Sequence, residues 1–499
     1  PRSPAARSAR ARRSARAVRS GMITLAAALS LSLATPNTGA AGTPIRTLLL
    51  TGHNNHNWRY TSRVHEETLE ATGRFTVDVT DDPGATLADA AALKAYQLFV
   101  LDYNDWHEPR PWPEASQRNF VEAVRAGAGV LVIHSANNAF KGWEDYESMV
   151  GLLWREGAGH GKFHEFTVNI VQPAHPVMKG LADFATTDEL YHNLSNPRNA
   201  RYSLLARALD STAIGGSGKQ EPMAITLDFG KGRVFATPLG HVWENQEATK
   251  VSIHTPGFRT LICRGGEWAA TGDVTLPAEW RDARTHNTLA SVEQAAGWTL
   301  LFDGSKPVGL KGWRQPAFPT KGWSATNGTL RHAAQGNGGD ITTVDEFGDF
   351  EFQCDWRVAP GGNSGIMYRC LEDRSYPWET GREMQILDNA RHKDGQKPST
   401  SAGAMYDLFP CSADVCRPAG EWNTARIVAR GTRIEHWLNG FKVVDIDTAS
   451  PQYAETLAKS KFPGIAKDFG TPMRGRIALQ DHGDEVAFRN IKVRSLDGK

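Results

Sequence analysis

The sequence predicts two domains of different class, an α/β domain with a largely parallel sheet followed by an all-β sandwich or jelly roll. In the first half, short runs of Val, Leu and Ile alternate with helical patterns, as is typical of parallel strands buried on both faces. In the second half, strands of alternating polarity are separated by turns, as in β-sandwiches. A chain of 499 residues is also too long for one ordinary domain. We expect the α/β domain over residues 45–275, a linker with a short helix over 276–296 and the β domain over 297–497.

Residues 1–41 have the pattern of a secretory signal peptide. The first 20 residues contain seven arginines and no acidic residue, and an uncharged apolar run from Met22 to Ala34 follows. Small residues at Thr38–Ala41 suit a cleavage site, and the apolar run is short for a membrane span. We therefore expect export to the periplasm or the exterior, with no transmembrane domain after cleavage. An uncleaved anchor is the alternative.

The charge of the expected mature chain argues against nucleic acid as a partner. Removing residues 1–41 takes away seven positive charges and lowers the formal net charge from +1 to −6. Nucleic-acid-binding domains are typically basic. We expect a small polar molecule as the ligand, and the sequence leaves the oligomeric state open.

Four buried strands are predicted in the first domain, and each ends at polar residues. The strands cover Arg46–Thr51, Tyr96–Asp102, Gly129–His134 and Arg233–Leu239, with helices near residues 62–72, 114–126 and 255–270. Ligands of open α/β sheets bind outside the carboxyl ends of the strands. Four residues at these ends could therefore line one crevice, namely His53, Asp102, His134 and His241. Any one of these histidines alone would more often be a structural group.

Alternating strands and tight turns predict the second domain, which opens with Gly297-Trp-Thr-Leu-Leu-Phe-Asp-Gly304. Strands at Thr424–Ala429 and Arg433–Leu438 are predicted to pair, and Asn439-Gly440 is a strong signal for the type I′ turn of a further hairpin. The stretch from Asp349 to Val358 alternates in polarity, which places five side chains on the core face, namely Phe350, Phe352, Cys354, Trp356 and Val358.

Two predicted strands of this domain carry acid, amide and imidazole groups on one face. Successive side chains of a strand point to opposite faces, so Glu383 and Gln385 share one face and the apolar residues beside them share the other. By the same rule Gln480 and His482 point the same way. A sheet with one apolar face and one face of this kind indicates a polar ligand such as a sugar.

The five cysteines do not form a disulfide scaffold in a chain of this length, and no pair has CxxC spacing. Cys411 and Cys416 bracket a short loop that could close as a disulfide in an oxidising compartment. Cys354 and Cys370 are expected on strands, as buried thiols or a cross-strand bridge. Cys263 is expected to be buried in a helix.

The motifs of the first domain, taken in order, resemble the ThuA-like family of trehalose utilisation. They include the runs Leu-Leu-Leu-Thr-Gly-His53, Val-Leu-Val-Ile-His-Ser-Ala136, Ala-His-Pro-Val-Met-Lys-Gly180 and Lys-Gly-Arg-Val-Phe-Ala-Thr-Pro-Leu-Gly-His241. The resemblance implies a flavodoxin-like fold similar to class I glutamine amidotransferases. Those enzymes carry a cysteine at the sharp turn after a central strand, whereas this chain has His134-Ser135 there. We therefore do not expect amidotransferase chemistry, and the Gly-x-Ser-x-Gly motif of serine hydrolases is absent.

The motifs of the second domain resemble the 3-keto-disaccharide hydrolase family, also described as 3-keto-glucoside lyases and hydratases. They include the runs Asn-Ser-Gly-Ile366, Glu-Met-Gln-Ile-Leu-Asp388, Ala-Gly-Ala-Met-Tyr406 and Ile-Ala-Leu-Gln-Asp-His-Gly483. The resemblance implies a concanavalin-like jelly roll whose concave sheet holds the sugar. It also implies cleavage of a sugar that is already oxidised at C3.

A ketone at C3 acidifies the C2 proton, so such a site needs a base, an acid for the leaving group and a group that stabilises the enolate oxygen. We expect Glu383 and His482 to be the base and acid, in an order that the sequence does not settle. Tyr406, Gln385 or Arg369 would stabilise the enolate, although Arg369 shares a strand face with the apolar Met367. The residues expected to bind the sugar are Asn363, Arg369, Gln385, Asp388 and Gln480.

Other readings of the sequence stay open. A divalent metal could polarise the ketone in place of a side chain, but no residue spacing demands one, and no GxGxxG motif for a nicotinamide cofactor follows a strand. The protein could instead be a non-catalytic carbohydrate-binding protein, because jelly rolls serve both purposes. Alternatively, the main chemistry could lie in the first domain.

Overall fold

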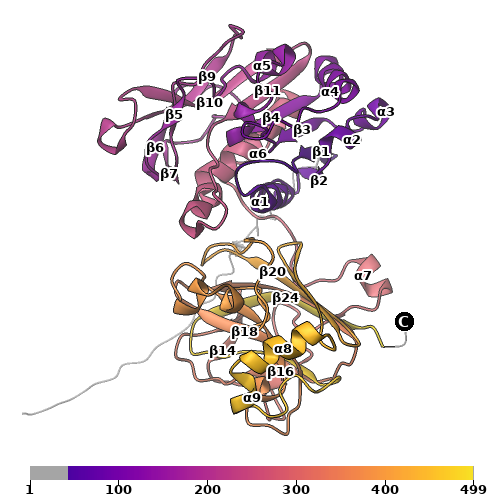
Figure 1. The fold of residues 1–499 in the computed structure, drawn as a ribbon. Coiled ribbons are helices and arrows are strands. Elements are labelled where there is room, and N and C mark those ends of the chain that lie inside the picture. Colours follow the sequence, from indigo (N-terminus) through magenta and orange to yellow (C-terminus); the bar gives the residue numbers. More distant parts are fainter. Residues whose placement is uncertain (1–42, 498–499) are drawn as a thin grey trace, which may run out of the picture. The chain divides into compact units, whose positions relative to one another are not determined.

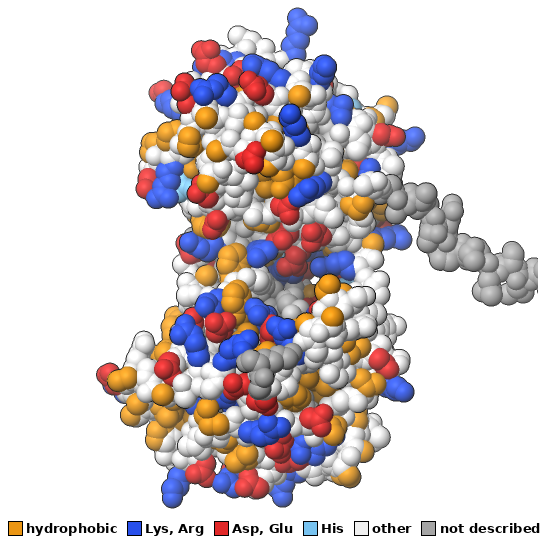
Figure 2. Space-filling view, turned by 90° about the vertical axis from the view of Figure 1, so that its right-hand side faces the viewer, with side chains coloured by type: hydrophobic (Ala, Val, Ile, Leu, Met, Phe, Trp, Pro, Cys, Tyr) orange, Lys and Arg blue, Asp and Glu red, His pale blue; other side chains and the backbone are white. Residues whose placement is uncertain are grey.

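The computed structural model describes residues 43–497. The expected signal peptide, residues 1–41, lies outside the described residues. None of the helices in the described part has the length and apolar character needed to cross a membrane. Lys and Arg side chains are interspersed with Asp and Glu over the face of the molecule seen in Figure 2.

The first domain is built on a nine-stranded mixed sheet with the order β2-β1-β3-β4-β11-β10-β9-β6-β7 (Figure 1). Its first five strands are parallel to one another, namely β2 (Phe75–Thr80), β1 (Ile45–Leu50), β3 (Leu98–Leu101), β4 (Gly129–Ile133) and β11 (Gly232–Thr237). An antiparallel extension follows, consisting of β10 (Gln220–Phe229), β9 (Ser203–Leu209), β6 (His164–Ile170) and β7 (Phe184–Asp188). The parallel half confirms the predicted α/β class, and the extension adds strands that the sequence analysis did not identify.

Helices cover both faces of the parallel half. On one face, α1 (Trp58–Glu70) and α6 (Pro256–Thr271) pack on side chains that include Leu49. On the other face, α4 (Glu114–Ala126) and α5 (Glu144–Val150) pack on side chains that include Leu48. Neighbouring residues of one strand therefore enter opposite cores, which explains why the strand runs are apolar throughout. The parallel half is thus a doubly wound, flavodoxin-like arrangement.

The second domain is a sandwich of two antiparallel sheets. The larger sheet has the path β14-β15-β24-β17-β20-β21-β22, with β12 beside β24, and the smaller has the order β13-β16-β23-β18-β19. The strands of the larger sheet are β12 (Thr299–Leu300), β14 (Trp323–Thr326), β15 (Thr329–His332), β17 (Phe350–Val358), β20 (Asn423–Arg430), β21 (Arg433–Leu438), β22 (Phe441–Asp447) and β24 (Val486–Ser495). Those of the smaller are β13 (Leu310–Gly312), β16 (Ile341–Thr343), β18 (Asn363–Cys370), β19 (Arg382–Leu387) and β23 (Arg476–Leu479). One hydrophobic core draws side chains from both sheets, which confirms the jelly-roll class.

Local predictions in this domain agree with the structure. The five apolar side chains predicted to face inward on Phe350–Val358 are all in the core. Asn439 and Gly440 connect β21 to β22 with φ values of 49° and 84°, both positive as a type I′ turn requires. Two short helices were not anticipated, α8 (Pro451–Lys459) and α9 (Phe462–Ile465), and α9 borders the cavity described below.

All five cysteines are free thiols. Cys263 is buried in α6, as expected. Cys411 and Cys416 are not bonded to each other, and each thiol instead contacts a backbone carbonyl, that of Ala402 and that of Arg417 respectively. The suggested bridge across this loop is therefore not formed.

Candidate functional site

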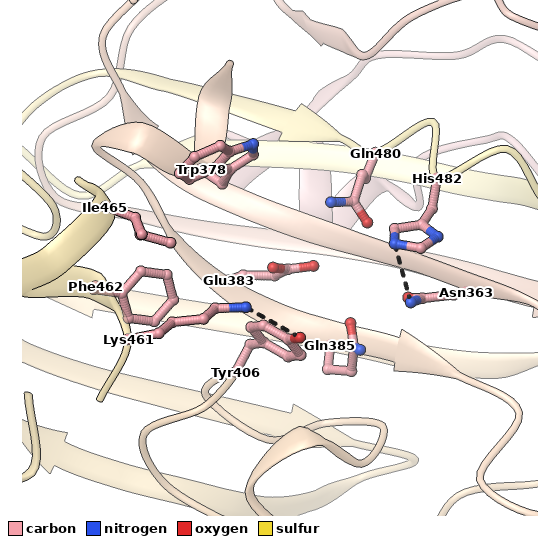
Figure 3. Close-up of a pocket in the computed structure, with 10 residues that line it drawn as sticks. All are labelled: Asn363, Trp378, Glu383, Gln385, Tyr406, Lys461, Phe462, Ile465, Gln480 and His482. Atoms are coloured by element: carbon pink, nitrogen blue, oxygen red, sulfur yellow. Dashed lines mark hydrogen bonds between the residues drawn. The ribbon is translucent and has the colours of Figure 1, made fainter. Parts of the chain in front are cut away.

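A cavity of about 260 Å³ opens on the smaller sheet of the second domain (Figure 3). Strand β18 lies between β19 and β23, so sequence motifs that are about a hundred residues apart meet on one face. Ten residues line the cavity: Asn363, Trp378, Glu383, Gln385, Tyr406, Lys461, Phe462, Ile465, Gln480 and His482. Six of them were predicted from the sequence, namely Asn363, Glu383, Gln385, Tyr406, Gln480 and His482.

The predicted alternation of β19 is confirmed. Met384 and Ile386 are fully buried in the core of the sandwich, while Glu383 and Gln385 face the cavity. Beyond the end of β23, Gln480 and His482 face the same cavity, while Leu479 joins the core. Strand geometry therefore presents a polar face to the ligand and an apolar face to the opposite sheet.

Glu383 is the central ionisable group of this cavity. The residue is 8% exposed, and no hydrogen bond within the described residues reaches its carboxyl group. Burial raises the pKa of Glu383 to about 8, against the opposing effect of the nearby Lys461, and the carboxylates of Asp340 and Asp394 add to the increase. A carboxyl group with a pKa close to neutrality can transfer protons in either direction during turnover.

Gly365 makes the space that this carboxyl group occupies. It lies on β18, opposite Gln385 in the sheet register. A Cβ atom at position 365 would lie 1.8 Å from Oε1 of Glu383, a distance that no real contact allows. The glycine in the Asn-Ser-Gly-Ile366 motif is therefore required by the position of Glu383.

Lys461 and Tyr406 form a polar wall beside Glu383. The Lys461 ammonium group donates to the Tyr406 hydroxyl over 3.3 Å and lies 4.4 Å from the centre of its ring. The same hydroxyl donates to Asp394 over 3.3 Å. Burial raises the pKa of Tyr406 above its ordinary value, and the negative charges of Asp394 and Glu383 reinforce the increase. The ammonium group therefore offers a charged donor to an oxygen atom in the cavity, while the single O–H of Tyr406 is directed to Asp394.

Sequence reasoning missed Lys461, Phe462, Ile465 and Trp378. Lys461 precedes α9, far in sequence from the strands that carry the other polar groups. No periodicity or motif connects this segment to the sheet, so its approach to Glu383 is a result of tertiary folding alone.

The opposite wall offers free hydrogen-bond acceptors. Asn363 Oδ1 and Gln480 Oε1 are buried, and neither has a hydrogen-bond partner in the described chain. Buried amide oxygens of this kind require a donor, which the hydroxyl groups of a sugar can supply. Asn363 Nδ2 lies 3.4 Å from His482 Nε2, and the His482 side chain is 48% exposed at the cavity mouth.

No hydrogen bond joins Glu383 to His482 among the described residues. The two groups belong to different strand ends, one in the floor and one at the exposed rim. They are therefore placed to act on different atoms of one ligand.

The structure corrects the expectation for Arg369. This side chain is 1% exposed and does not line the cavity, since its guanidinium donates to the carbonyls of Gly348 and Gly431 and pairs with Asp349 at 3.3 Å. Arg369 also has a φ of 56°, and the pairing of β18 with β23 shifts register between Tyr368 and Cys370. Arg369 thus anchors neighbouring loops instead of binding sugar.

Asp388 is also absent from the cavity. Its carboxylate accepts hydrogen bonds from the backbone N–H groups of Gly361, at 2.7 Å, and Ala390, at 3.1 Å. These bonds fix the turn at the end of β19, so the carboxylate is engaged in holding backbone and not in binding a ligand.

In the first domain, the structure brings together two of the four predicted crevice residues. His134 Nε2 lies 3.1 Å from His241 Nδ1. His53 lies elsewhere, with its Nε2 against the carbonyl of Glu108 at 2.9 Å. Asp102 is buried and accepts a hydrogen bond from Thr61 at 2.7 Å, and burial raises its pKa to about 7.

The missing partner of the two histidines is His56. Its Nε2 lies 3.4 Å from His134 Nε2, and all three rings are buried. Burial is also the main cause of the lowered pKa of each ring. The run Gly52-His-Asn-Asn-His56 contains both candidate histidines, and the sequence analysis assigned the crevice to His53 and not to His56. His134 has a φ of 47°, so the sharp turn expected after the central strand is present.

Sequence comparison gives two family matches. The profile of the 3-keto-alpha-glucoside-1,2-lyase-like domain matches residues 297–494, and that of the trehalose utilisation (ThuA) domain matches residues 46–269. A protein of Bacteroides thetaiotaomicron named 3-keto-disaccharide hydrolase is 32% identical over 232 residues, which cover 41% of this chain and 80% of that protein.

Solved structures from the genus Parabacteroides resemble each half of the chain. A Parabacteroides merdae protein that is provisionally classed as ThuA-like is 36% identical to this chain, with a TM-score of 0.42. The match covers 47% of this chain and 92% of the Parabacteroides merdae chain. A protein of Parabacteroides distasonis, provisionally classed as a glycosyl hydrolase, is 30% identical with a TM-score of 0.40, over 43% of this chain and 100% of that one.

Proposed function

The chain belongs to the family of the 3-keto-alpha-glucoside-1,2-lyase-like domain, and on that premise we propose that its C-terminal cavity cleaves 3-keto-glycosides. The observation that carries the proposal is the carboxyl group of Glu383, which is buried, has no hydrogen-bond partner in the described chain and has a pKa of about 8. The name of the Bacteroides relative supports the same substrate class.

The proposed reaction is an elimination followed by hydration. A base removes the C2 proton, and the electron pair of the C–H bond forms an enolate with the C3 ketone. The pair then returns to form the C1–C2 double bond, and the C1–O bond breaks as the leaving oxygen takes a proton. Addition of water across that double bond completes a net hydrolysis. No attack on an unactivated glycosidic bond by two carboxylates is needed.

We assign the base to Glu383 and the acid to His482. Once deprotonated, a carboxylate with a raised pKa is a stronger base than an ordinary glutamate. His482 lies at the exposed rim, where the leaving alcohol departs. Lys461 would stabilise the enolate oxygen by its charge, and the Tyr406 hydroxyl would add a hydrogen bond when its O–H turns from Asp394 to the substrate.

The remaining lining residues suit one sugar ring. A cavity of about 260 Å³ is slightly below the common range of about 300–1,000 Å³ for small-ligand sites. The unpartnered acceptors of Asn363 and Gln480, together with the amide of Gln385, would bind hydroxyl groups. Trp378 and Phe462 supply an apolar wall for the face of the ring.

Release of 4-nitrophenol from a 4-nitrophenyl 3-keto-glucoside tests the proposal. We expect turnover by the wild-type protein and a loss of about 10²–10⁴-fold in Glu383→Gln, because general acid–base groups contribute on that order. Glu379→Gln is the matched control, since Glu379 lies near the cavity in sequence but not among its lining residues. Binding of the 3-keto sugar without release would support a carbohydrate-binding protein instead, and full activity in Glu383→Gln would reject the assigned base.

We also propose that the mature protein acts outside the cytoplasm. The arginine-rich start and the apolar run of residues 1–41 support this location. Fractionation of cells that express the full chain tests it, and retention of the unprocessed protein in the cytoplasm would contradict it.

A further inference from the structure

The first domain contains a second polar centre, formed by the rings of His56, His134 and His241, which we call the histidine cluster. We propose that this cluster binds one divalent transition-metal ion of the zinc class, with Glu189 as the fourth ligand. The inference concerns a site separate from the sugar cavity and does not depend on the proposed reaction.

The spacing of the ligand atoms fits such an ion. Nε2 of His134 lies 3.4 Å from Nε2 of His56 and 3.1 Å from Nδ1 of His241, and Glu189 Oε2 is 3.1 Å from that Nδ1. Zinc–nitrogen bonds of about 2.0–2.1 Å at tetrahedral angles place neighbouring ligand atoms roughly 3.3–3.4 Å apart. Within residues 43–497, the three histidines are the one group of three or more His, Cys, Asp or Glu residues whose ligand atoms converge within 4.8 Å. Glu189 contacts His241 but lies outside this group, so its carboxylate has to turn toward the ion to become the fourth ligand.

Hydrogen bonds outside the cluster fix which nitrogen faces inward for His134 and His56, whereas Nε2 of His241 is buried without a hydrogen-bond partner in the described chain. His134 Nδ1 lies 2.7 Å from the carbonyl of Pro238, which can only accept, so Nδ1 carries the proton and Nε2 carries a lone pair. His56 Nδ1 lies 3.0 Å from Asn54 Oδ1. The backbone N–H of His56 donates to the same Asn54 atom, which identifies it as the oxygen. His56 Nε2 therefore also carries a lone pair.

Two nitrogen lone pairs thus face each other over 3.4 Å in a buried space. The hydroxyl of Tyr191, 3.0 Å from His134 Nε2, can donate to that nitrogen, but no N–H or O–H of the described chain donates to His56 Nε2. Glu189 Oε2 is likewise buried without a hydrogen-bond partner in the described chain. A cation between the two imidazole nitrogens satisfies both of them, and the carboxylate of Glu189, beside His241, supplies a compensating negative charge.

The ring of His56 is also held from its flat side. Trp243 stacks on it with ring centres 4.6 Å apart and an angle of 17° between the planes. Backbone hydrogen bonding, the amide of Asn54 and this stacking together orient the imidazole before any ligand binds. Neighbouring groups that hold a metal-binding histidine in a fixed orientation are typical of metal sites.

The donor set selects the kind of ion. Imidazole nitrogens suit zinc, iron, cobalt, nickel and copper, whereas magnesium and calcium prefer oxygen ligands. Three imidazoles and one carboxylate therefore favour zinc or a related transition metal. The cluster lies at the carboxyl ends of β1, β4 and β11, where ligands of α/β sheets bind. His160 has a side chain that is 37% exposed and lies 3.4 Å from Glu189, which marks the solvent side of the site.

Metal titration of the untagged protein tests the inference. After chelator treatment and dialysis, we expect Zn²⁺ to bind with one equivalent per chain and Co²⁺ to give the visible absorption of a site with nitrogen ligands. His134→Ala should weaken Zn²⁺ binding by at least about 100-fold, because it removes a direct ligand. His53→Ala is the matched control and should bind like the wild type, since His53 contacts the Glu108 carbonyl outside the cluster.

Two further variants keep the test decisive if His134→Ala does not fold. Glu189→Gln preserves shape while removing the ligand charge, and Asn54→Ala removes only the group that orients His56. We expect both to fold, as checked by circular dichroism, and to bind Zn²⁺ about 10–100-fold more weakly. Absence of stoichiometric Zn²⁺ and Co²⁺ binding by the wild type would overturn the inference. Equal affinities in wild type, Glu189→Gln and Asn54→Ala would overturn it as well.

Discussion

Replacing Glu383 with glutamine should change how the stability of the second domain depends on pH. The folded protein raises the pKa of this carboxyl group to about 8, against an ordinary value of 4.5. Between these values the folded state keeps the proton while the unfolded state has lost it. Stability therefore falls as the pH rises through this window, by about 1.4 kcal/mol per pH unit and by roughly 5 kcal/mol over the whole window.

The Glu383→Gln variant resembles the protonated form at every pH. We therefore compare the free energies of unfolding of the variant and the wild type. The variant's excess over the wild type should be constant below about pH 4.5, increase between pH 4.5 and about pH 8, and then level off. In a domain of about 200 residues, 1 kcal/mol corresponds to a change of about 2–4 °C in Tm. The difference in Tm should accordingly grow by about 3–6 °C per pH unit.

Differential scanning calorimetry of the protein between pH 5 and pH 9 measures this difference. Glu379→Gln, which makes the same chemical change at a carboxyl group that does not line the cavity, is the matched control. Parallel curves for Glu383→Gln and wild type across this range would refute the reasoning, because they would mean that Glu383 has an ordinary pKa in the folded protein.

Three other changes test the site more locally. Gly365→Ala should displace the Glu383 carboxyl group and reduce kcat/KM for a 3-keto-glucoside by at least about 100-fold. It should also lower the free energy of unfolding by about 1–3 kcal/mol. Wild-type kinetics in this variant would contradict the packing argument. If Glu383 is the base, kcat/KM should fall as the pH drops below about 8. Lys461→Met should shift this acidic limb of the pH profile to higher pH, because the lysine lowers the pKa of Glu383. An unchanged acidic limb would argue against the electrostatic contact between the two groups. Arg369→Met should lower the free energy of unfolding by about 2–3 kcal/mol while leaving KM within about twofold, and a large increase in KM would restore Arg369 to the substrate site.

Strand periodicity was sufficient to identify most of the polar residues that line the cavity of the second domain. A side-chain period of two fixed the shared face of Glu383 and Gln385, and the same rule placed Gln480 and His482 together. The rule failed at Arg369, where a positive φ and a register shift break the alternation of β18. A local irregularity of this kind has no marker in the sequence, because the residue is not a glycine.

Other parts of the fold required information about topology. His56 joins His134 and His241 only because the chain brings the ends of three parallel strands together, and the sequence does not give the strand order. The strands of the antiparallel extension were missed for a related reason. For example, Ser203–Leu209 mixes exposed and buried residues irregularly, and its pairing with Gln220–Phe229 contains register shifts.

The cavity of the second domain draws its residues from two structurally different sources. Glu383 and Gln385 belong to β19, the edge strand of the smaller sheet, whereas Lys461, Phe462 and Ile465 come from the helical segment of residues 451–465 that connects β22 to β23. The segment is an insertion between strands and contributes one wall without contributing the proposed base. Replacing this segment would therefore change the shape of the cavity and, through the loss of Lys461, also raise the pKa of Glu383, although the strand that carries the carboxyl group would be untouched.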